Sequence, residues 1–164
     1  MLRFPKIKWS MVNYVKLLLP MFMGYLTSSV CWDKTNSTRA GQSVSFRPPA
    51  KVFGIVWPIL YVLLGLSWII STANARGTAN ARGTTNARGT MIDFSFVLII
   101  VFLTSWIIVY GCNKNKIGGV YVIACSMGSV ILAMNMAPLE ARLMLVPLLT
   151  WLMLALLLNA FEVY

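Results

Sequence analysis

Long apolar runs separated by polar segments make up most of this sequence. The clearest run extends from Val52 to Ile70 without a charged residue, which is close to the about 20 residues that a helix needs to cross the hydrocarbon core of a bilayer. Comparable runs predict membrane-spanning helices over residues 11–32, 52–71, 94–112, 120–136 and 141–161. We therefore expect an all-α integral membrane protein, in which a bundle of five transmembrane helices forms a single membrane domain over residues 1–164.

The first apolar run, residues 11–32, contains a lysine at position 16 and a proline at position 20. A signal peptide is the alternative interpretation, because basic residues precede the run. However, the run exceeds the about 7–15 apolar residues of a signal-peptide core, and no small-residue cleavage site closes it. We therefore favour a retained first span, in which Lys16 lies near the basic end and extends to the membrane interface.

Two longer polar segments are predicted to lie outside the helices. Residues 33–51 contain Pro48-Pro49 and form a loop of the length that often acts as a functional lid. Residues 73–90 are three tandem hexads of the form (Ala/Thr)-Asn-Ala-Arg-Gly-Thr. A glycine in each hexad and the absence of apolar periodicity predict a flexible repeat insertion rather than a packed element.

The charge balance is strongly basic, with 14 Lys and Arg against 4 Asp and Glu and a net charge of +10. On a soluble protein this charge would suggest nucleic-acid binding. Here 59% of the residues are hydrophobic and only 11% are charged, against about 25% charged residues in a soluble domain. Because most basic residues lie between the apolar runs, we expect them to face anionic lipid headgroups. The expected partner is the lipid bilayer, with no nucleic acid.

Few side chains suited to catalysis or metal binding are present. The sequence contains no histidine, which is the commonest general base and metal ligand. The four acidic residues lie near the ends of the predicted spans rather than together: Asp33, Asp93, Glu140 and Glu162. The cysteines, Cys31, Cys112 and Cys125, lack the spacing of a metal site and are interpreted as structural thiols. We therefore expect no catalytic residues, no metal site and no required cofactor.

Aromatic residues line one side of the predicted second helix. Trp57, Tyr61 and Trp68 stand at offsets of 0, 4 and 11 residues, which places them on one helical face. The fifth helix carries a second face of this kind, formed by Trp151, Ala155, Leu158 and Asn159. Helix packing or an aromatic belt at the membrane interface is one interpretation. However, Trp57 and Trp151 lie several residues inside their spans, where an indole N–H needs a partner. A planar ligand with a polar edge would meet this need, and Pro58 opens space by kinking the helix.

Two motifs resemble those of a known membrane protein family. The first is Phe46-Arg-Pro-Pro, followed by Val52-Phe-Gly-Ile-Val-Trp57 and Leu60-Tyr61-x-x-x-Gly65. The second lies in the fifth span and comprises Ala141-Arg142-Leu, Pro147, Trp151, Ala155 and Leu158-Asn159. Together they are similar to the signature of the translocator protein / tryptophan-rich sensory protein family, also called the peripheral-type benzodiazepine receptor family. The resemblance covers residues 15–164.

The resemblance implies a five-helix bundle, assembled as a homodimer, with a pocket that binds flat hydrophobic ligands. Porphyrin or haem is the first ligand class that it implies, and sterols and isoquinoline- or benzodiazepine-like drugs also fall within the family's range. Carried over by matching residues, the ligand-binding set comprises Phe46, Pro48 and Pro49 in the loop, Phe53, Trp57 and Tyr61 in the second span, Ser105 in the third, and Trp151, Ala155, Leu158 and Asn159 in the fifth. The implied location is a multi-pass position in a membrane, which for a eukaryotic or viral protein would be the mitochondrial outer membrane or another organelle membrane.

The sequence departs from the family pattern at several positions. Ser105 stands at the place of an asparagine in the third span, and the glutamine that usually precedes it is replaced. The chain also lacks the C-terminal pattern of Leu or Val, Tyr, and Lys or Arg that is associated with cholesterol in vertebrate members, itself a weak pattern.

The preferred function is a membrane receptor or carrier for a porphyrin-like ligand. The alternatives are a light-dependent porphyrin-degrading enzyme, which would use the same pocket, and a membrane scaffold.

Small residues, which are frequent in the fourth span, motivate the scaffold alternative. They are Ala124, Cys125, Ser126, Gly128, Ser129 and Ala133. Small residues let helix backbones approach closely in lipid, so this helix is predicted to pack on a neighbour. Under the scaffold alternative, that neighbour is a second copy of the chain or another membrane protein.

Overall fold

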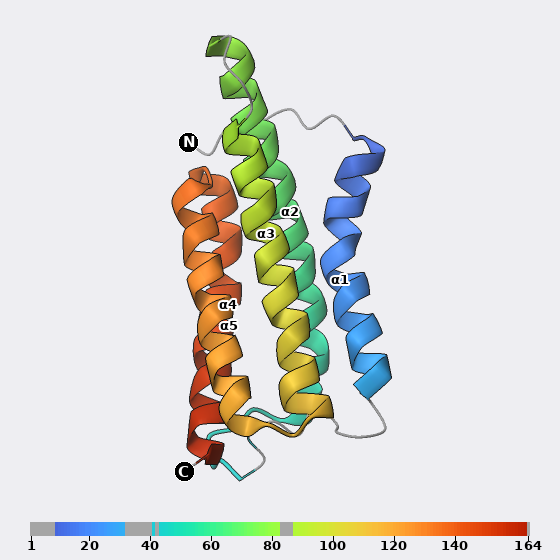
Figure 1. Ribbon diagram of the computed structural model, residues 1–164, viewed down its shortest axis with the longest axis vertical. Helices are drawn as coiled ribbons and strands as arrows, with labels where there is room; N and C mark the ends of the chain where they lie inside the picture. The colour runs from blue at the N-terminus through green and yellow to red at the C-terminus, as the bar shows by residue number, and fades with distance from the viewer. Residues whose placement is uncertain (1–8, 32–40, 42, 83–86, 164) are drawn as a thin grey trace.

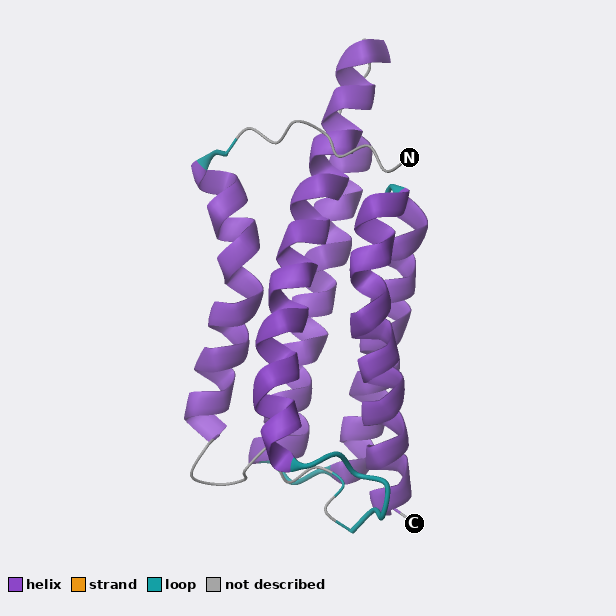
Figure 2. Ribbon diagram, turned by 180° about the vertical axis from the view of Figure 1, so that it is seen from behind, coloured by secondary structure: helices purple, strands orange, loops and turns teal. Residues whose placement is uncertain are grey.

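The computed structural model describes residues 9–31, 41, 43–82 and 87–163 of the chain. Five long helices run side by side in a bundle (Figure 1). They are α1 (Met11–Cys31), α2 (Ala50–Arg82), α3 (Ala87–Trp106), α4 (Lys116–Met136) and α5 (Leu139–Val163), and the π-helix η2 (Ile107–Cys112) continues α3. The described residues form no strand (Figure 2). All five helices are long and apolar enough to cross a membrane, which confirms the predicted fold class.

The core of the bundle consists of large apolar side chains from α2, α3, α4 and α5. Leu64, Phe96 and Leu152 are almost completely buried, and Trp68 of α2 lies parallel to the Phe96 ring at 5.7 Å between ring centroids. Large apolar side chains such as Phe22 and Ile55 are exposed on the outside of the bundle. Because lipid, rather than water, covers this outer surface, helices that are apolar on all sides are expected.

The repeat segment is not the loop that its composition predicts. α2 continues through residues 73–82 and α3 begins at Ala87, so the predicted loop over 73–90 is wrong for these residues; residues 83–86 lie outside the described part. Alanine is the best helix former, and an existing helix extends without a new nucleation cost. Ala75 and Ala79, four residues apart, are buried, so the hexads have a small packed face. Figure 1 shows this part of α2 and α3 extending beyond the other helices.

The described part of the predicted lid lies against the end of α5. The backbone N–H of Gly41 donates to the Glu162 carboxylate at 2.9 Å, and Phe46 meets Phe161 edge to face at 5.6 Å. α2 begins at Ala50, two residues before the predicted start of the span at residue 52. Residues 33–40 and 42 lie outside the described part, so the lid function of the 33–51 loop stays a prediction.

A buried ion pair joins α1 to α3. Lys16 is only 5% exposed and pairs with Asp93, so its predicted extension to the membrane interface is wrong. Its ammonium also donates to the Thr72 hydroxyl at 3.2 Å and lies 5.2 Å from the Trp68 ring centroid. The Trp68 indole N–H donates to the same Asp93 carboxylate at 2.6 Å. A charge in hydrocarbon is tolerated when it is paired and hydrogen-bonded in this way. We call these four residues the Lys16–Asp93 cluster.

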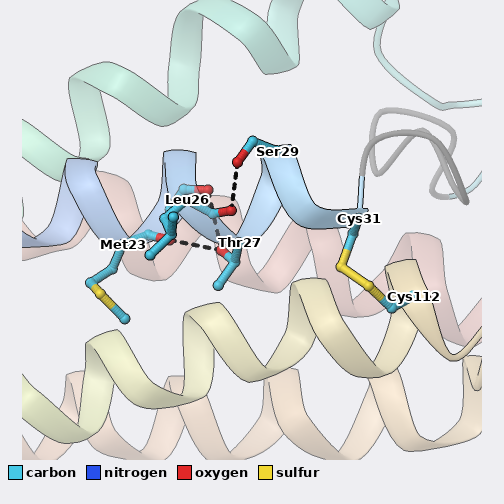
Figure 3. Close-up of a disulfide and its surroundings, with 7 residues drawn as sticks. Met23, Leu26, Thr27, Ser29, Cys31 and Cys112 are labelled. Atoms are coloured by element: carbon cyan, nitrogen blue, oxygen red, sulfur yellow. Dashed lines mark hydrogen bonds between the residues drawn. A yellow bond between two sulfur atoms is a disulfide. The ribbon is translucent and has the colours of Figure 1, made fainter.

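A disulfide joins the opposite end of α1 to η2. Cys31, the last residue of α1, bonds Cys112, the last residue of η2, with 5.1 Å between their Cα atoms (Figure 3). The interpretation of these two cysteines as thiols is therefore wrong, whereas Cys125 is a free, exposed thiol on α4. The two bonded residues stand 81 positions apart, and only the arrangement of the helices brings them together.

The small residues of α4 divide between two faces. Ser126, Ser129 and Ala133 are buried within the bundle, whereas Ala124, Cys125 and Gly128 are exposed on its outside. The inner face fits the prediction of close packing on a neighbouring helix, since α4 contacts both α3 and α5. Packing of the outer face on a second copy or a partner stays a prediction.

Candidate ligand-binding site

A cavity of about 390 Å³ lies between α1, α2 and the α3–η2 junction. Its volume is within the range of about 300–1,000 Å³ that is typical of small-molecule sites. The lining comprises Met21, Gly24, Tyr25 and Ser28 of α1, Phe53, Gly54, Trp57, Pro58 and Tyr61 of α2, and Leu103, Trp106 and Ile107 of α3 and η2. Most of these side chains are apolar. The cavity therefore favours an apolar guest over a charged one.

Helical spacing on α2 explains the aromatic wall of this cavity. Phe53, Trp57 and Tyr61 follow each other at intervals of four residues and lie on one helical face. Gly24 of α1 faces Tyr61 so closely that a Cβ atom at Gly24 would lie 2.6 Å from the tyrosine ring. Glycine at this position therefore lets α1 pass close to α2 beside the cavity. The second-span part of the predicted site thus lines a single cavity.

The aromatic rings form a continuous stack along this cavity. Trp57 lies next to Tyr61 at 5.6 Å with an interplanar angle of 30°, and next to Trp106 at 6.4 Å with an angle of 26°. Trp106 continues to Tyr110 at 5.4 Å and 17°. Neighbouring rings are tilted by 17–30° from one another, and offset stacking of this kind is a favourable aromatic arrangement. A flat guest parallel to these rings would extend the same geometry.

Polar groups fix both Trp106 and Tyr110 in position. The Trp106 indole N–H donates to the buried Asn159 side chain at 3.3 Å, and the Asn159 amide donates to the Ala155 carbonyl at 2.8 Å. The Tyr110 hydroxyl donates to the Glu162 carboxylate. α5 therefore supports the aromatic stack from behind, through residues that do not touch the cavity.

The π-helix places the end of this stack. It begins directly after Trp106 and carries Tyr110 and Cys112, and the Asn113 N–H donates five residues back to the Ile108 carbonyl at 3.0 Å. π-helical segments are rare in proteins, and those that do occur are often found at functional sites. The extra residue in the π-helical turn determines the direction of the side chains at the end of the third span, including Tyr110 and Cys112. No pattern in the sequence predicts this π-helix.

Trp151 of α5 lies behind the cavity wall instead of lining it. Its ring meets Trp57 edge to face at 6.5 Å and Phe53 at 5.3 Å. Its indole N–H is buried and makes no hydrogen bond with any described residue. Ala155 lines a second void of only about 10 Å³, which Trp57 and Trp106 also line. Trp57 and Trp151 therefore contact each other directly, and Trp151 supports the cavity wall without lining the cavity.

The remaining sequence-predicted residues lie away from the cavity lining. Leu158 packs against the backbone at Gly41, and Phe46 contacts Phe161 at the end of the bundle. Ser105, Pro48 and Pro49 are also absent from the lining. The structure thus brings together the second-span residues of the predicted site and places the loop and fifth-span residues around or behind them.

Trp106 and the α1 residues belong to the cavity but were not predicted as site residues. Trp106 lies several positions inside the third span, as Trp57 does inside the second, and this depth was the available signal. The α1 residues Met21, Gly24 and Ser28 carry no motif. They follow each other at intervals of three and four residues, a pattern of one helical face that any packed helix would show.

The family comparison agrees with this architecture. Residues 9–163 match the TspO/MBR family, the tryptophan-rich sensory and benzodiazepine-receptor proteins that the two sequence motifs resemble. Among curated proteins, none matches the chain. The family consists of five-helix membrane proteins, and the match runs from just before α1 to the last residue of α5. The chain is thus a multi-pass integral membrane protein that belongs to the TspO/MBR family.

Proposed function

We propose that this protein binds a flat, largely apolar tetrapyrrole, of the porphyrin or haem class, in the cavity between α1, α2 and the α3–η2 junction. The observation that carries the proposal is the stack of near-parallel Trp57 and Trp106 rings beside a cavity of about 390 Å³. A conjugated macrocycle gains stacking energy on such rings, whereas a sterol has no π-system to stack. A receptor or carrier role would use this same binding event. The homodimer and the organelle membrane stay predictions.

Arg47 supports an acidic porphyrin as the ligand. Its guanidinium carbon lies 5.0 Å from the centroid of the Phe53 ring, and Phe53 lines the cavity. A porphyrin whose macrocycle lies along the aromatic stack can place its carboxylates toward Phe53 and Arg47. Arginine binds carboxylates through directed, paired hydrogen bonds. The site therefore combines a flat apolar wall with a cation at its edge.

Removing either stacked indole should weaken porphyrin binding. We expect Trp57→Ala and Trp106→Ala each to lower the affinity for protoporphyrin at least about tenfold, because each loses ring contact area and a stacking partner. Trp151→Ala should have a smaller effect, since Trp151 touches the Trp57 ring only from behind. The measurement is a titration in detergent that follows the porphyrin's own absorption band, so that the loss of a tryptophan does not alter the signal.

Trp9→Ala is the matched control, because Trp9 is exposed and lies outside the cavity. Its affinity should equal that of the wild type. Each variant must keep the helical circular dichroism of the parent. A folded Trp57→Ala protein that binds protoporphyrin with unchanged affinity would show that the ligand does not occupy this cavity.

The role of Arg47 can be separated from that of the stack by changing the ligand. We expect Arg47→Gln to weaken binding of protoporphyrin diacid about threefold to tenfold, the effect of one partly solvated charge-assisted contact. Binding of the dimethyl ester, which carries no carboxylate, should not change. Lys51→Gln, an exposed charge close by on α2, serves as the control. Equal losses for diacid and ester would mean that Arg47 acts only through its packing on Phe53.

A further inference from the structure

α1, which forms one wall of the cavity, packs mainly on α2 and makes fewer contacts with α3 and η2. Four residues of α1 are buried, whereas side chains on its outer face, such as Phe22, Tyr25 and Val30, are largely exposed. Tyr25, which lines the cavity, is 76% exposed. Movement of this wall away from η2 would therefore break few contacts other than those with α2, and it would widen the cavity.

An ion pair and a disulfide link α1 to its neighbours, and the cavity lies between these two links. Toward one end, Lys16 of α1 pairs with Asp93 of α3. At the other end, Cys31 bonds Cys112 of η2. The four α1 residues that line the cavity fall between positions 21 and 28, so the lining part of α1 lies between these two links.

The disulfide lies directly beside the cavity. Cys31 follows the lining residue Ser28 by three positions, and Cys112 follows the lining residue Ile107 by five. The hydroxyls of Thr27 and Ser29 do not link this end of α1 to another helix. They donate to carbonyls of α1 itself, those of Met23, Gly24 and Leu26 (Figure 3). The covalent bond is therefore the strong link between α1 and η2 at this end.

We propose that Cys31–Cys112 is a reversible redox latch that controls how fast the ligand enters and leaves the cavity. The proposal rests on the proposed function for the identity of the ligand. In the oxidised protein the bond holds the end of α1 against η2. In the reduced protein this end of α1 moves away, while the Lys16–Asp93 cluster retains the other end. A movement of this kind gates access without changing the residues that bind the ligand.

The reductant is a dithiol. Its thiolate attacks the Sγ atom of Cys112, the more accessible of the two cysteines, and forms a mixed disulfide while the Cys31 sulfur leaves and takes up a proton. The second thiol of the reductant then attacks the mixed disulfide and releases the Cys112 thiol. Two electrons and two protons pass to the protein, and the dithiol becomes a cyclic disulfide. An oxidant of the disulfide class reverses these steps.

Two readouts test the latch in the full-length protein, with dithiothreitol as the reductant. The first is the distance between spin labels attached to ketone-bearing residues that replace Ser29 and Ile55, two exposed positions on α1 and α2. We expect a narrow distance distribution in the oxidised protein and a longer, broader one after reduction. The second is stopped-flow measurement of protoporphyrin binding, whose association and dissociation rates should both rise about tenfold on reduction.

Matched variants identify the bond that is responsible. The double variant Cys31→Ser/Cys112→Ser should behave as the reduced protein and should not respond to dithiothreitol. Cys125→Ser, which removes the free exposed thiol on α4, should keep the full response. An unchanged distance on reduction overturns the latch, and so does a changed distance with unchanged binding rates. If the distance changes but no porphyrin binds in either state, the proposed ligand is wrong, whereas movement of α1 under redox control is supported.

Discussion

Asp93→Asn is expected to destabilise the protein by about 3–5 kcal/mol, because it leaves the buried Lys16 ammonium without a countercharge. The side chain of Lys16 is 7% exposed and that of Asp93 is 36% exposed. When its partner is removed, the Asp93 carboxylate can therefore be solvated by lipid headgroups or water better than the Lys16 ammonium can. Lys16→Met should therefore cost less, about 2 kcal/mol, since the carboxylate left behind is partly solvated and keeps the Trp68 N–H.

The double variant Lys16→Met/Asp93→Asn provides the decisive comparison. It leaves no unpaired charge, and the asparagine oxygen can still accept from Trp68, so most of the lost stability should return. The measurement is unfolding of the purified protein in mixed detergent micelles, with each variant compared under the same conditions. Additive losses in the double variant would show that the two charges do not stabilise the fold as a pair.

Gly65→Ala is expected to push α1 away from α2. A Cβ atom at Gly65 would lie 2.8 Å from both the Cα and the carbonyl oxygen of Leu17, and 3.0 Å from the carbonyl oxygen of Lys16. These are backbone atoms, so no side-chain rotation relieves the overlap, and the helix itself must move. Overpacking of this kind costs about 1–3 kcal/mol. The displaced α1 should also weaken the nearby Lys16–Asp93 pair, which raises the total loss.

The control for this substitution is Gly128→Ala on the outer face of α4. A Cβ atom at Gly128 meets nothing within 4 Å, so this change should be neutral or stabilise the helix by up to about 1 kcal/mol. Thermal unfolding in detergent, in the presence and absence of dithiothreitol, gives the comparison. Because the disulfide still holds the other end of α1, the loss in Gly65→Ala should grow on reduction. Equal stability of the two variants would contradict the close approach of α1 and α2.

The helical architecture could be predicted from the sequence because the length and polarity of each span depend on local composition alone. In lipid, the backbone N–H and C=O groups of the uninterrupted run from Val52 to Ile70 must form hydrogen bonds within the run itself, which a helix provides. The aromatic face of Phe53, Trp57 and Tyr61 was predictable for a similar reason, since it follows from the helical repeat. These features need no knowledge of which helix lies beside which.

The features that could not be predicted depend on neighbours. The pairing of Cys31 with Cys112 and the burial of Lys16 against Asp93 join residues far apart in the sequence, and several arrangements of five apolar helices would give other partners. The placement of Trp151 behind Trp57 has the same origin. The helix over the hexads is not evident from the sequence, because each hexad contains a glycine and no apolar periodicity, although an alanine pair such as Ala75 and Ala79 suffices for packing two helices closely.

The extension of α2 and α3 beyond the bundle has a geometric consequence for the repeats. α2 has 33 residues, or about 50 Å at 1.5 Å per residue, whereas the hydrocarbon core is about 30 Å thick. About 20 Å of the helix therefore extends beyond the hydrocarbon core. One hexad adds about 9 Å and about one and two-thirds turns to a helix. A relative that gained or lost a single hexad in α2 would therefore carry the arginines of this extension at a different angle around the helix axis.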